Sequence, residues 1–90
     1  MAWTDEATCV VDRVPMDVFF PAWETNDALA RARAVCDRCP VSTRCLEEAM
    51  HAERGQSRSA RAGIYGGRTP AERAQLMRRR QKDARQRAVA

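Results

Sequence analysis

Four cysteines in a chain of 90 residues limit what it can fold into more than any other feature. A chain of this length forms one domain with a small core. Only 6% of its residues are aromatic, so few large side chains are available to fill that core. Domains this small usually need disulfides or a metal as an additional constraint. The cysteines that can supply it are spaced Cys9-x26-Cys36-x2-Cys39-x5-Cys45.

The start of the chain does not resemble a signal peptide. Met1 to Glu6 carries no basic segment, and no apolar run follows it. No stretch approaches the length needed to span a bilayer. We therefore expect a cytoplasmic protein that does not contact membranes. In a reducing cytoplasm, closely spaced cysteines indicate metal or redox chemistry rather than structural disulfides.

The hydrophobic pattern predicts an all-α fold, since no segment alternates apolar and polar residues with the period of a strand. We expect a small bundle of about four to five short helices around the cysteines. The first helix should begin after a Thr4 cap and end before Pro15, with Cys9 off its apolar stripe. That stripe consists of Trp3, Ala7, Val10, Val11 and Val14.

Two further helices should carry the other three cysteines. After a short turn at Met16 to Pro21, Thr25 or Asn26 caps a helix whose apolar stripe runs to Cys36 and Cys39. Pro40 suits the first position of the next helix, which ends at Gly55. The inward face of that helix comprises Val41, Cys45, Leu46, Ala49 and Met50.

The last third of the chain combines a loop, a glycine-rich turn and a final helix. Gln56 to Ala62 is polar and basic and should form a mobile loop. The run Gly63-Ile64-Tyr65-Gly66-Gly67 predicts a turn, because glycine permits positive φ. Thr69-Pro70-Ala71-Glu72 has the pattern of a capping box and begins the helix. We expect a metal-binding and partner-binding domain at 1–77 and a basic tail at 78–90.

Charge is distributed unevenly along the chain. Residues 1–53 carry 5 Lys and Arg against 10 Asp and Glu, whereas residues 54–90 carry 11 against 2. A basic arm of this kind attracts polyanions, and arginines can enter a narrow minor groove. A solvated run that aids solubility is the alternative. The residues expected to contact DNA are Arg78, Arg79, Arg80, Lys82, Arg85 and Arg87.

Thiolates in this spacing favour a soft metal centre, either an iron–sulfur cluster or zinc. Zinc sites with four cysteines often use two CxxC pairs, whereas this chain has one CxxC and two single cysteines. Cys39-Pro40 is also similar to the Cys-Pro of bacterial cluster motifs, so the spacing favours the cluster over zinc. A thioredoxin-like site would need a βαβ context, which the pattern lacks. Four buried cysteines acting as small apolar residues remain a further alternative.

Several motifs together resemble the WhiB-like family of actinobacteria and their phages. They occur in the family's order and span residues 3 to about 80. Tyr65 stands where many members have tryptophan. The matching segments are Trp3…Cys9, Phe19-Phe20-Pro21, Cys36-Asp37-Arg38-Cys39-Pro40-Val41-Ser42-Thr43-Arg44-Cys45-Leu46, Gly63-Ile64-Tyr65-Gly66-Gly67 and Ala71-Glu72-Arg73.

The resemblance implies a transcription regulator that responds to redox state and nitric oxide and is not an enzyme. A [4Fe–4S] cluster would be held by Cys9, Cys36, Cys39 and Cys45, and the freed thiols could form disulfides in the apo form. The partners would be region 4 of the primary sigma factor, within RNA polymerase holoenzyme, and promoter DNA. The chain would be a monomer in a heterocomplex with the sigma factor. Partner contacts would come from Trp3, Phe19, Phe20, Pro21, Tyr65, Gly66 and Gly67.

Two other functions compete with this one. The cluster-free form could act as a thiol–disulfide reductase through Cys36 and Cys39. Alternatively, the four cysteines could hold zinc and stabilise a DNA-binding module. Metal and sulfide analysis separates the cluster from zinc, and a turnover assay tests the reductase.

Overall fold

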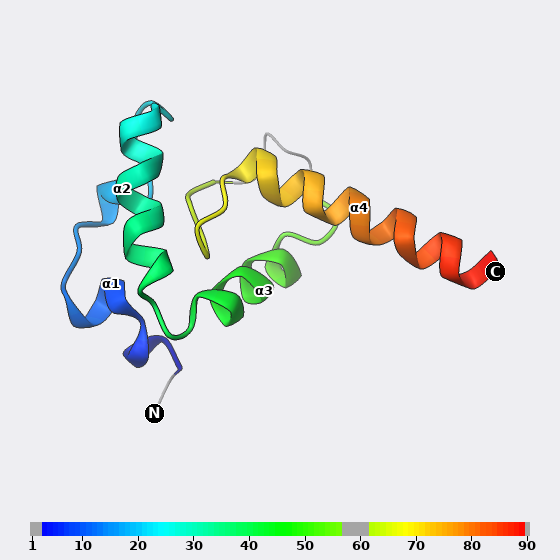
Figure 1. Ribbon diagram of the computed structural model, residues 1–90, viewed down its shortest axis with the longest axis horizontal. Helices are drawn as coiled ribbons and strands as arrows, with labels where there is room; N and C mark the ends of the chain where they lie inside the picture. The colour runs from blue at the N-terminus through cyan, green and yellow to red at the C-terminus, as the bar shows by residue number, and fades with distance from the viewer. Residues whose placement is uncertain (1–2, 57–61, 90) are drawn as a thin grey trace.

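A computed structural model describes residues 3–56 and 62–89. Within these ranges the chain forms four α-helices and two 3₁₀ helices, with no strand beyond one isolated bridge between Tyr65 and Arg68 (Figure 1). The predicted all-α fold is confirmed. The core of the expected mobile loop, residues 57–61, lies outside the described residues.

The first segment differs from the single helix that its pattern predicts. A 3₁₀ helix, Trp3–Glu6 (η1), is followed by a short helix, Thr8–Val11 (α1). Ala7 separates them because its backbone is extended, at ψ 135°, and no side chain caps α1. Ala7 is buried, whereas Val10 and Val11 are exposed, so the predicted apolar stripe does not pack as one face.

The second helix matches its prediction closely. After a 3₁₀ turn at Met16–Val18 (η2), Thr25 caps α2, Asn26–Asp37, and its side chain accepts a hydrogen bond from the Ala28 N–H at 3.1 Å. Ala32 and Val35 form the buried part of its inner face. The cap and the apolar spacing thus place Cys36 in the last turn of α2.

The third helix, Ser42–Ala52 (α3), begins two residues later than predicted. Pro40 lies in the connection rather than at the first helical position, and Val41 is the N-cap residue with no side-chain cap bond. Cys39 and Pro40 therefore form a bend between α2 and α3. Gly55, with φ +81°, follows the end of α3.

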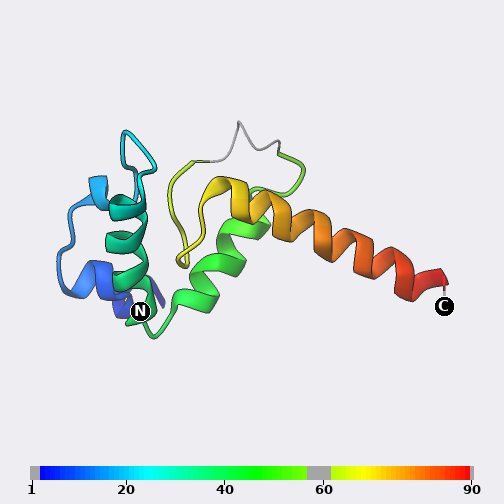
Figure 2. The same cartoon turned by 45° about the horizontal axis from the view of Figure 1, so that its top comes forward.

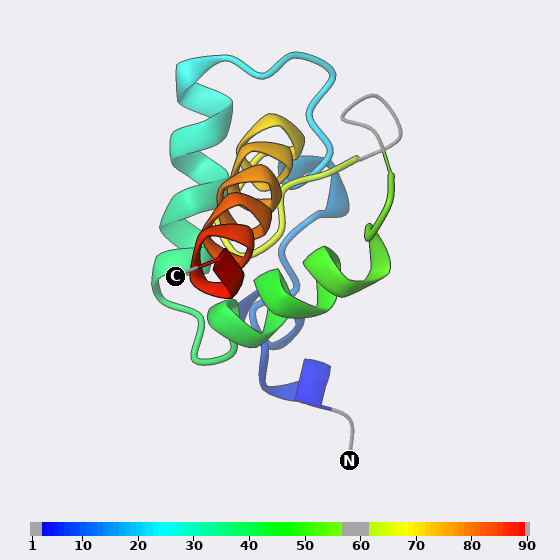
Figure 3. The same cartoon turned by 90° about the vertical axis from the view of Figure 1, so that its right-hand side faces the viewer.

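The last helix, Pro70–Val89 (α4), has 20 residues and spans about 30 Å. Its start packs near α2 and α3, and its remainder projects away from the body (Figures 1 and 2). In the view nearly along α4, α2 and α3 lie on two sides of it (Figure 3). The helix is continuous across the predicted boundary between residues 77 and 78. No helix in the described ranges is long and apolar enough to cross a membrane.

Candidate metal centre

Each cysteine comes from a different local structure. Cys9 lies in α1, Cys36 in the last turn of α2, Cys39 in the bend that follows, and Cys45 in the first turn of α3. All four are half-buried free thiols. A hydrogen bond from Thr8 Oγ1 to the Arg38 carbonyl, at 3.3 Å, joins α1 to the end of α2. The fold thus brings a distant N-terminal cysteine to the Cys36–Cys45 region.

The thiols are close enough to influence one another electrostatically. Burial raises the pKa of Cys36, and the proximity of Cys45, Cys39 and Cys9 raises it further. Burial likewise raises the pKa of Cys45, with Cys9 and Cys39 adding to the effect while Arg73 opposes it. A metal that binds here must therefore displace protons from Cys36 and Cys45, whose neutral thiol form burial favours.

The glycine-rich turn covers this cysteine group and donates hydrogen bonds to it. The Gly67 N–H donates to the Cys36 sulfur and the Gly66 N–H donates to the Cys45 sulfur, and each bond lowers the pKa of its thiol. Both glycines have positive φ, +59° for Gly66 and +77° for Gly67. A Cβ on Gly66 would lie 2.7 Å from both the Leu46 Cβ and the Ser42 carbonyl oxygen. Only glycine lets the backbone approach α3 so closely.

Arg33 holds the turn from the side of α2. Its Nε donates to the Gly67 carbonyl at 3.1 Å, and its Nη2 donates to Glu72 Oε1 at 2.6 Å. Glu72 also accepts from the Thr69 N–H, while the Glu72 N–H donates to Thr69 Oγ1, which confirms the predicted capping box. Desolvation opposes ionisation of Glu72, but the Thr69 and Arg33 donors outweigh it and lower its pKa.

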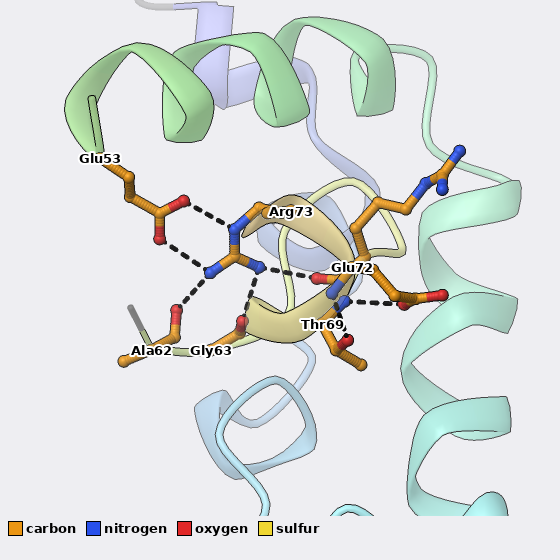
Figure 4. A network of polar contacts seen from close by, with 7 residues as sticks. Glu53, Ala62, Gly63, Thr69, Glu72 and Arg73 are labelled. Atoms are coloured by element: carbon orange, nitrogen blue, oxygen red, sulfur yellow. Dashed lines mark hydrogen bonds and ion pairs between the residues drawn. The ribbon is translucent and has the colours of Figure 1, made fainter. Parts of the chain in front are cut away.

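Arg73 holds the turn from the side of α4 and is fully buried. Its guanidinium donates five hydrogen bonds of 2.7–2.9 Å, two to the carboxylate of Glu53 and three to backbone carbonyls (Figure 4). All five N–H donors of the side chain are thereby used. The three carbonyls belong to Ala62, Gly63 and Arg68, which lie on both arms of the turn.

The predicted partner-contacting aromatics fall into two places. Phe20 and Tyr65 meet edge to face, with ring centroids 6.1 Å apart and an interplanar angle of 87°. The Ile64 N–H donates to the Phe19 carbonyl at 2.8 Å, which joins this segment to the turn. Phe20 is 43% exposed, and Phe19, Pro21 and Tyr65 are half-buried. Trp3 instead lies under the Arg44 guanidinium, whose Cζ is 5.1 Å from the centroid of the Trp3 ring.

The predicted DNA-contacting residues lie along the projecting part of α4 and are exposed. Arg80 differs from the others, because its Nη1 and Nη2 donate to Glu47 of α3 at 3.0 and 2.7 Å. This pairing lowers the pKa of Glu47 and raises that of Arg80. The other predicted contacts are Arg78, Arg79, Lys82, Arg85 and Arg87.

The donor set fits a thiolate-ligated centre with hydrogen-bonded sulfurs. In the described ranges, no three His, Cys, Asp or Glu side chains converge closely enough to hold a single metal ion. Four cysteine thiolates also suit zinc, so the ligand types alone fit either centre. Thiolate ligands and N–H donors to sulfur are the features that hold iron–sulfur clusters and set their potentials.

Sequence reasoning missed the polar side chains that hold the turn. Arg73 was recognised only as part of the Ala71-Glu72-Arg73 motif, and nothing in the sequence pairs it with Glu53 or pairs Arg33 with Glu72. A charged residue at an inward helical position, such as Arg73 beside Ala74, was the available signal.

Comparison with known proteins gives a consistent result. The family model described as "Transcription factor WhiB" matches residues 3–76. The chain is 40% identical over 82 residues to Transcriptional regulator WhiB1 of Mycobacterium tuberculosis, in strains H37Rv and CDC 1551 / Oshkosh, covering 88% of this chain and 88% of each relative. The family match includes all four cysteines and the glycine-rich turn and ends before residues 78–90.

Proposed function

Because the chain belongs to the WhiB family of transcription factors, we propose that its four cysteines hold a [4Fe–4S] cluster and that it regulates transcription by docking on a sigma factor. Its role as a transcriptional regulator is not enzymatic. One observation carries the proposal: the turn that hydrogen-bonds to Cys36 and Cys45 also presents Tyr65 against Phe20. The metal ligands and the aromatic surface thus share one structural element.

The ligands are Cys9, Cys36, Cys39 and Cys45. When bound, a [4Fe–4S] cluster supplies a redox-active centre that reacts with oxygen and nitric oxide. The chain's own contribution is to bring thiols from α1, α2, the bend and α3 together and to donate N–H bonds to two of them. Ligation by Cys9 would also fix α1, which the hydrogen bond from Thr8 to Arg38 already joins to the end of α2.

The state of the cysteines controls the aromatic surface through the turn. With Cys36 and Cys45 fixed, the Gly66 and Gly67 amides have acceptors and the preceding residue, Tyr65, is held in place. Release of these sulfurs, followed by disulfide formation, would remove those acceptors and let the turn move. Oxidation or nitrosylation at the centre would in this way weaken docking.

The docking partner is region 4 of the primary sigma factor, and the contacts come from Trp3, the Phe19-Phe20-Pro21 segment and the Tyr65 turn. Aromatic side chains that are at least partly exposed, such as Phe20 and Tyr65, are typical anchors of protein interfaces. The chain is a monomer within that heterocomplex. Its basic residues 78–90 then lie on a projecting helix, where they can contact promoter phosphates.

Binding of a sigma region-4 fragment to the anaerobically purified full chain tests this function. Trp3→Ala and Tyr65→Ala should each weaken binding by roughly tenfold or more without loss of iron or sulfide. Val11→Ala is the control, because Val11 is an exposed apolar residue of α1 that is not among the proposed contact residues, and it should bind like the unmodified chain. Absence of binding by the unmodified chain, or equal binding by all variants, would refute sigma docking.

A further inference from the structure

Arg73 makes contacts that go beyond support of the helix on which it lies. Its side chain is 0% exposed, and all five of its N–H donors are hydrogen-bonded, so five separate acceptor atoms fix its position. Two of these bonds go to Glu53, at the end of α3, and three go to carbonyls of the turn. A guanidinium is the one side chain with donors in this rigid fork.

The face of the same guanidinium is also in contact with an aromatic ring. The Arg73 Cζ lies 5.1 Å from the centroid of Tyr65, in cation–π geometry. The Tyr65 ring in turn packs edge to face against the Phe20 ring. The carbonyls of Gly63 and Arg68, on the two arms of the turn, are both bound by Nη1. Arg73 therefore fixes the backbone on both sides of Tyr65 and supports one face of its ring.

We propose that Arg73 is the positioning residue of the docking surface, because its guanidinium sets the orientation of the Tyr65 ring against Phe20. This inference rests on the proposed function, since it assumes that Tyr65 contacts the partner. Lysine cannot replace Arg73 in this role. An ammonium group has three donors, so at least two of the five acceptor atoms would lose their bond, and it has no flat face for the ring.

The sequence provides a specific probe, because Tyr65 is the only tyrosine of the chain. Incorporation of 3-fluorotyrosine therefore places a single ¹⁹F label on this ring. In Arg73→Lys, the ¹⁹F resonance should move toward the position of a solvent-exposed tyrosine while iron and sulfide content stay unchanged. Arg54→Lys, the same change at an exposed arginine beyond α3, should leave the resonance where it is.

Affinity for the sigma fragment gives the second readout. Arg73→Lys should weaken binding roughly tenfold, which is about 1.4 kcal/mol. In a Tyr65→Ala background the same change should cost less than about twofold, because the residue acts through the ring that has been removed. Equal loss in both backgrounds, or an unmoved ¹⁹F resonance, would overturn the proposal.

Two further outcomes are also decisive. If the unmodified chain does not bind the fragment, sigma docking fails, and the ¹⁹F measurement alone decides whether Arg73 positions Tyr65. If Arg73→Lys does not fold, the unmodified chain is measured instead. Its Arg73 Nε–H should then exchange slowly with solvent and show cross-peaks to the Tyr65 ring protons, and their absence would overturn the proposal.

Discussion

Two arginine–glutamate pairs join the α3 segment to α4, about two turns of α4 apart. They have the same chemistry but differ in exposure to solvent. Both arginines bind their carboxylates through two donors, Arg73 to Glu53 and Arg80 to Glu47. The side chains of the first pair are 0% and 11% exposed, and those of the second are 45% and 50% exposed. The same kind of contact is thus desolvated near the start of α4 and exposed to water near its middle.

Solvent decides what each pair can do. Two buried charges depend on each other, so losing one partner leaves the other uncompensated. An exposed pair is screened by salt and contributes little to stability, and other ions can compete for its partners. The first turns of α4 therefore have a structural role. Arg80 remains available to phosphate groups, because only its weak contact with Glu47 would be lost.

The largest expected effect is that of Glu53→Gln. The amide keeps the shape of the side chain but leaves the buried Arg73 charge without its counter-charge, which should destabilise the fold by about 3–5 kcal/mol. Denaturant unfolding of the full chain measures this. The matched change Glu47→Gln should cost less than about 1 kcal/mol. Similar values for both would show that burial does not distinguish the pairs.

Gly66→Ala should have the next largest effect. The added Cβ would lie 2.7 Å from Leu46 and Ser42 atoms in a backbone of positive φ, so the turn must shift away from Cys45 at about 1–3 kcal/mol. The variant should also lose iron faster than the unmodified chain in the presence of a chelator. Gly55→Ala is the control, because it shares the positive φ but has no atom within 4 Å of its Cβ. Equal iron loss in the two variants would contradict the close approach.

Thr69→Ala should cost about 1 kcal/mol, since it removes the Oγ1 acceptor of the Glu72 N–H at the start of α4. Thermal unfolding measures the change. Thr25→Ala removes the corresponding cap of α2 and serves as the comparison. Because Thr69 is buried beside the turn, its loss should also reduce sigma binding, whereas Thr25→Ala should not. Unchanged stability in Thr69→Ala would exclude the capping box as a structural element.

The smallest effect is expected at the exposed pair. Glu47→Gln releases Arg80, so DNA affinity should rise a fewfold at low salt. The slope of log affinity against log salt concentration should become steeper by up to about 1, which corresponds to one additional phosphate contact. Glu48→Gln, whose carboxylate lies 4.0 Å from Arg44 instead, should change neither quantity. Equal affinity of both variants would show that Glu47 does not compete with DNA.

The same pair should depend on pH in a defined direction. Pairing with Arg80 lowers the pKa of Glu47 below its usual value. The carboxylate therefore stays ionised at neutral pH, and its contribution is lost only as pH falls through that lowered pKa. The difference in DNA affinity between Glu47→Gln and the unmodified chain should accordingly vanish in acid rather than in base.

Local signals in the sequence predicted much of the fold. The Thr69–Glu72 capping box, the Thr25 cap and the glycine turn are set by contacts between residues a few positions apart, and all three are confirmed. The prediction of a single first helix was wrong because the sequence pattern contains no signal for the extended backbone of Ala7. Pro40 is tolerated at a helix start, but here Cys39 and Pro40 form the bend between α2 and α3, so α3 begins at Ser42.

The candidate site was predicted only in part for a related reason. Cysteine spacing identifies possible ligands because the donor atoms are chemically distinctive. The Arg73–Glu53 and Arg33–Glu72 pairs join residues 20 and 39 positions apart, and charged residues are common enough that no spacing singles them out. Their role follows from burial and from the turn that they enclose, which only the three-dimensional structure provides.

The most direct test is the metal and sulfide content of the full chain purified without oxygen. A cluster on Cys9, Cys36, Cys39 and Cys45 predicts a brown protein with about four iron and four sulfide per chain, and Cys→Ala at any of the four should lower both. A colourless protein with about one zinc per chain and no sulfide would contradict the central claim and favour a zinc-stabilised module.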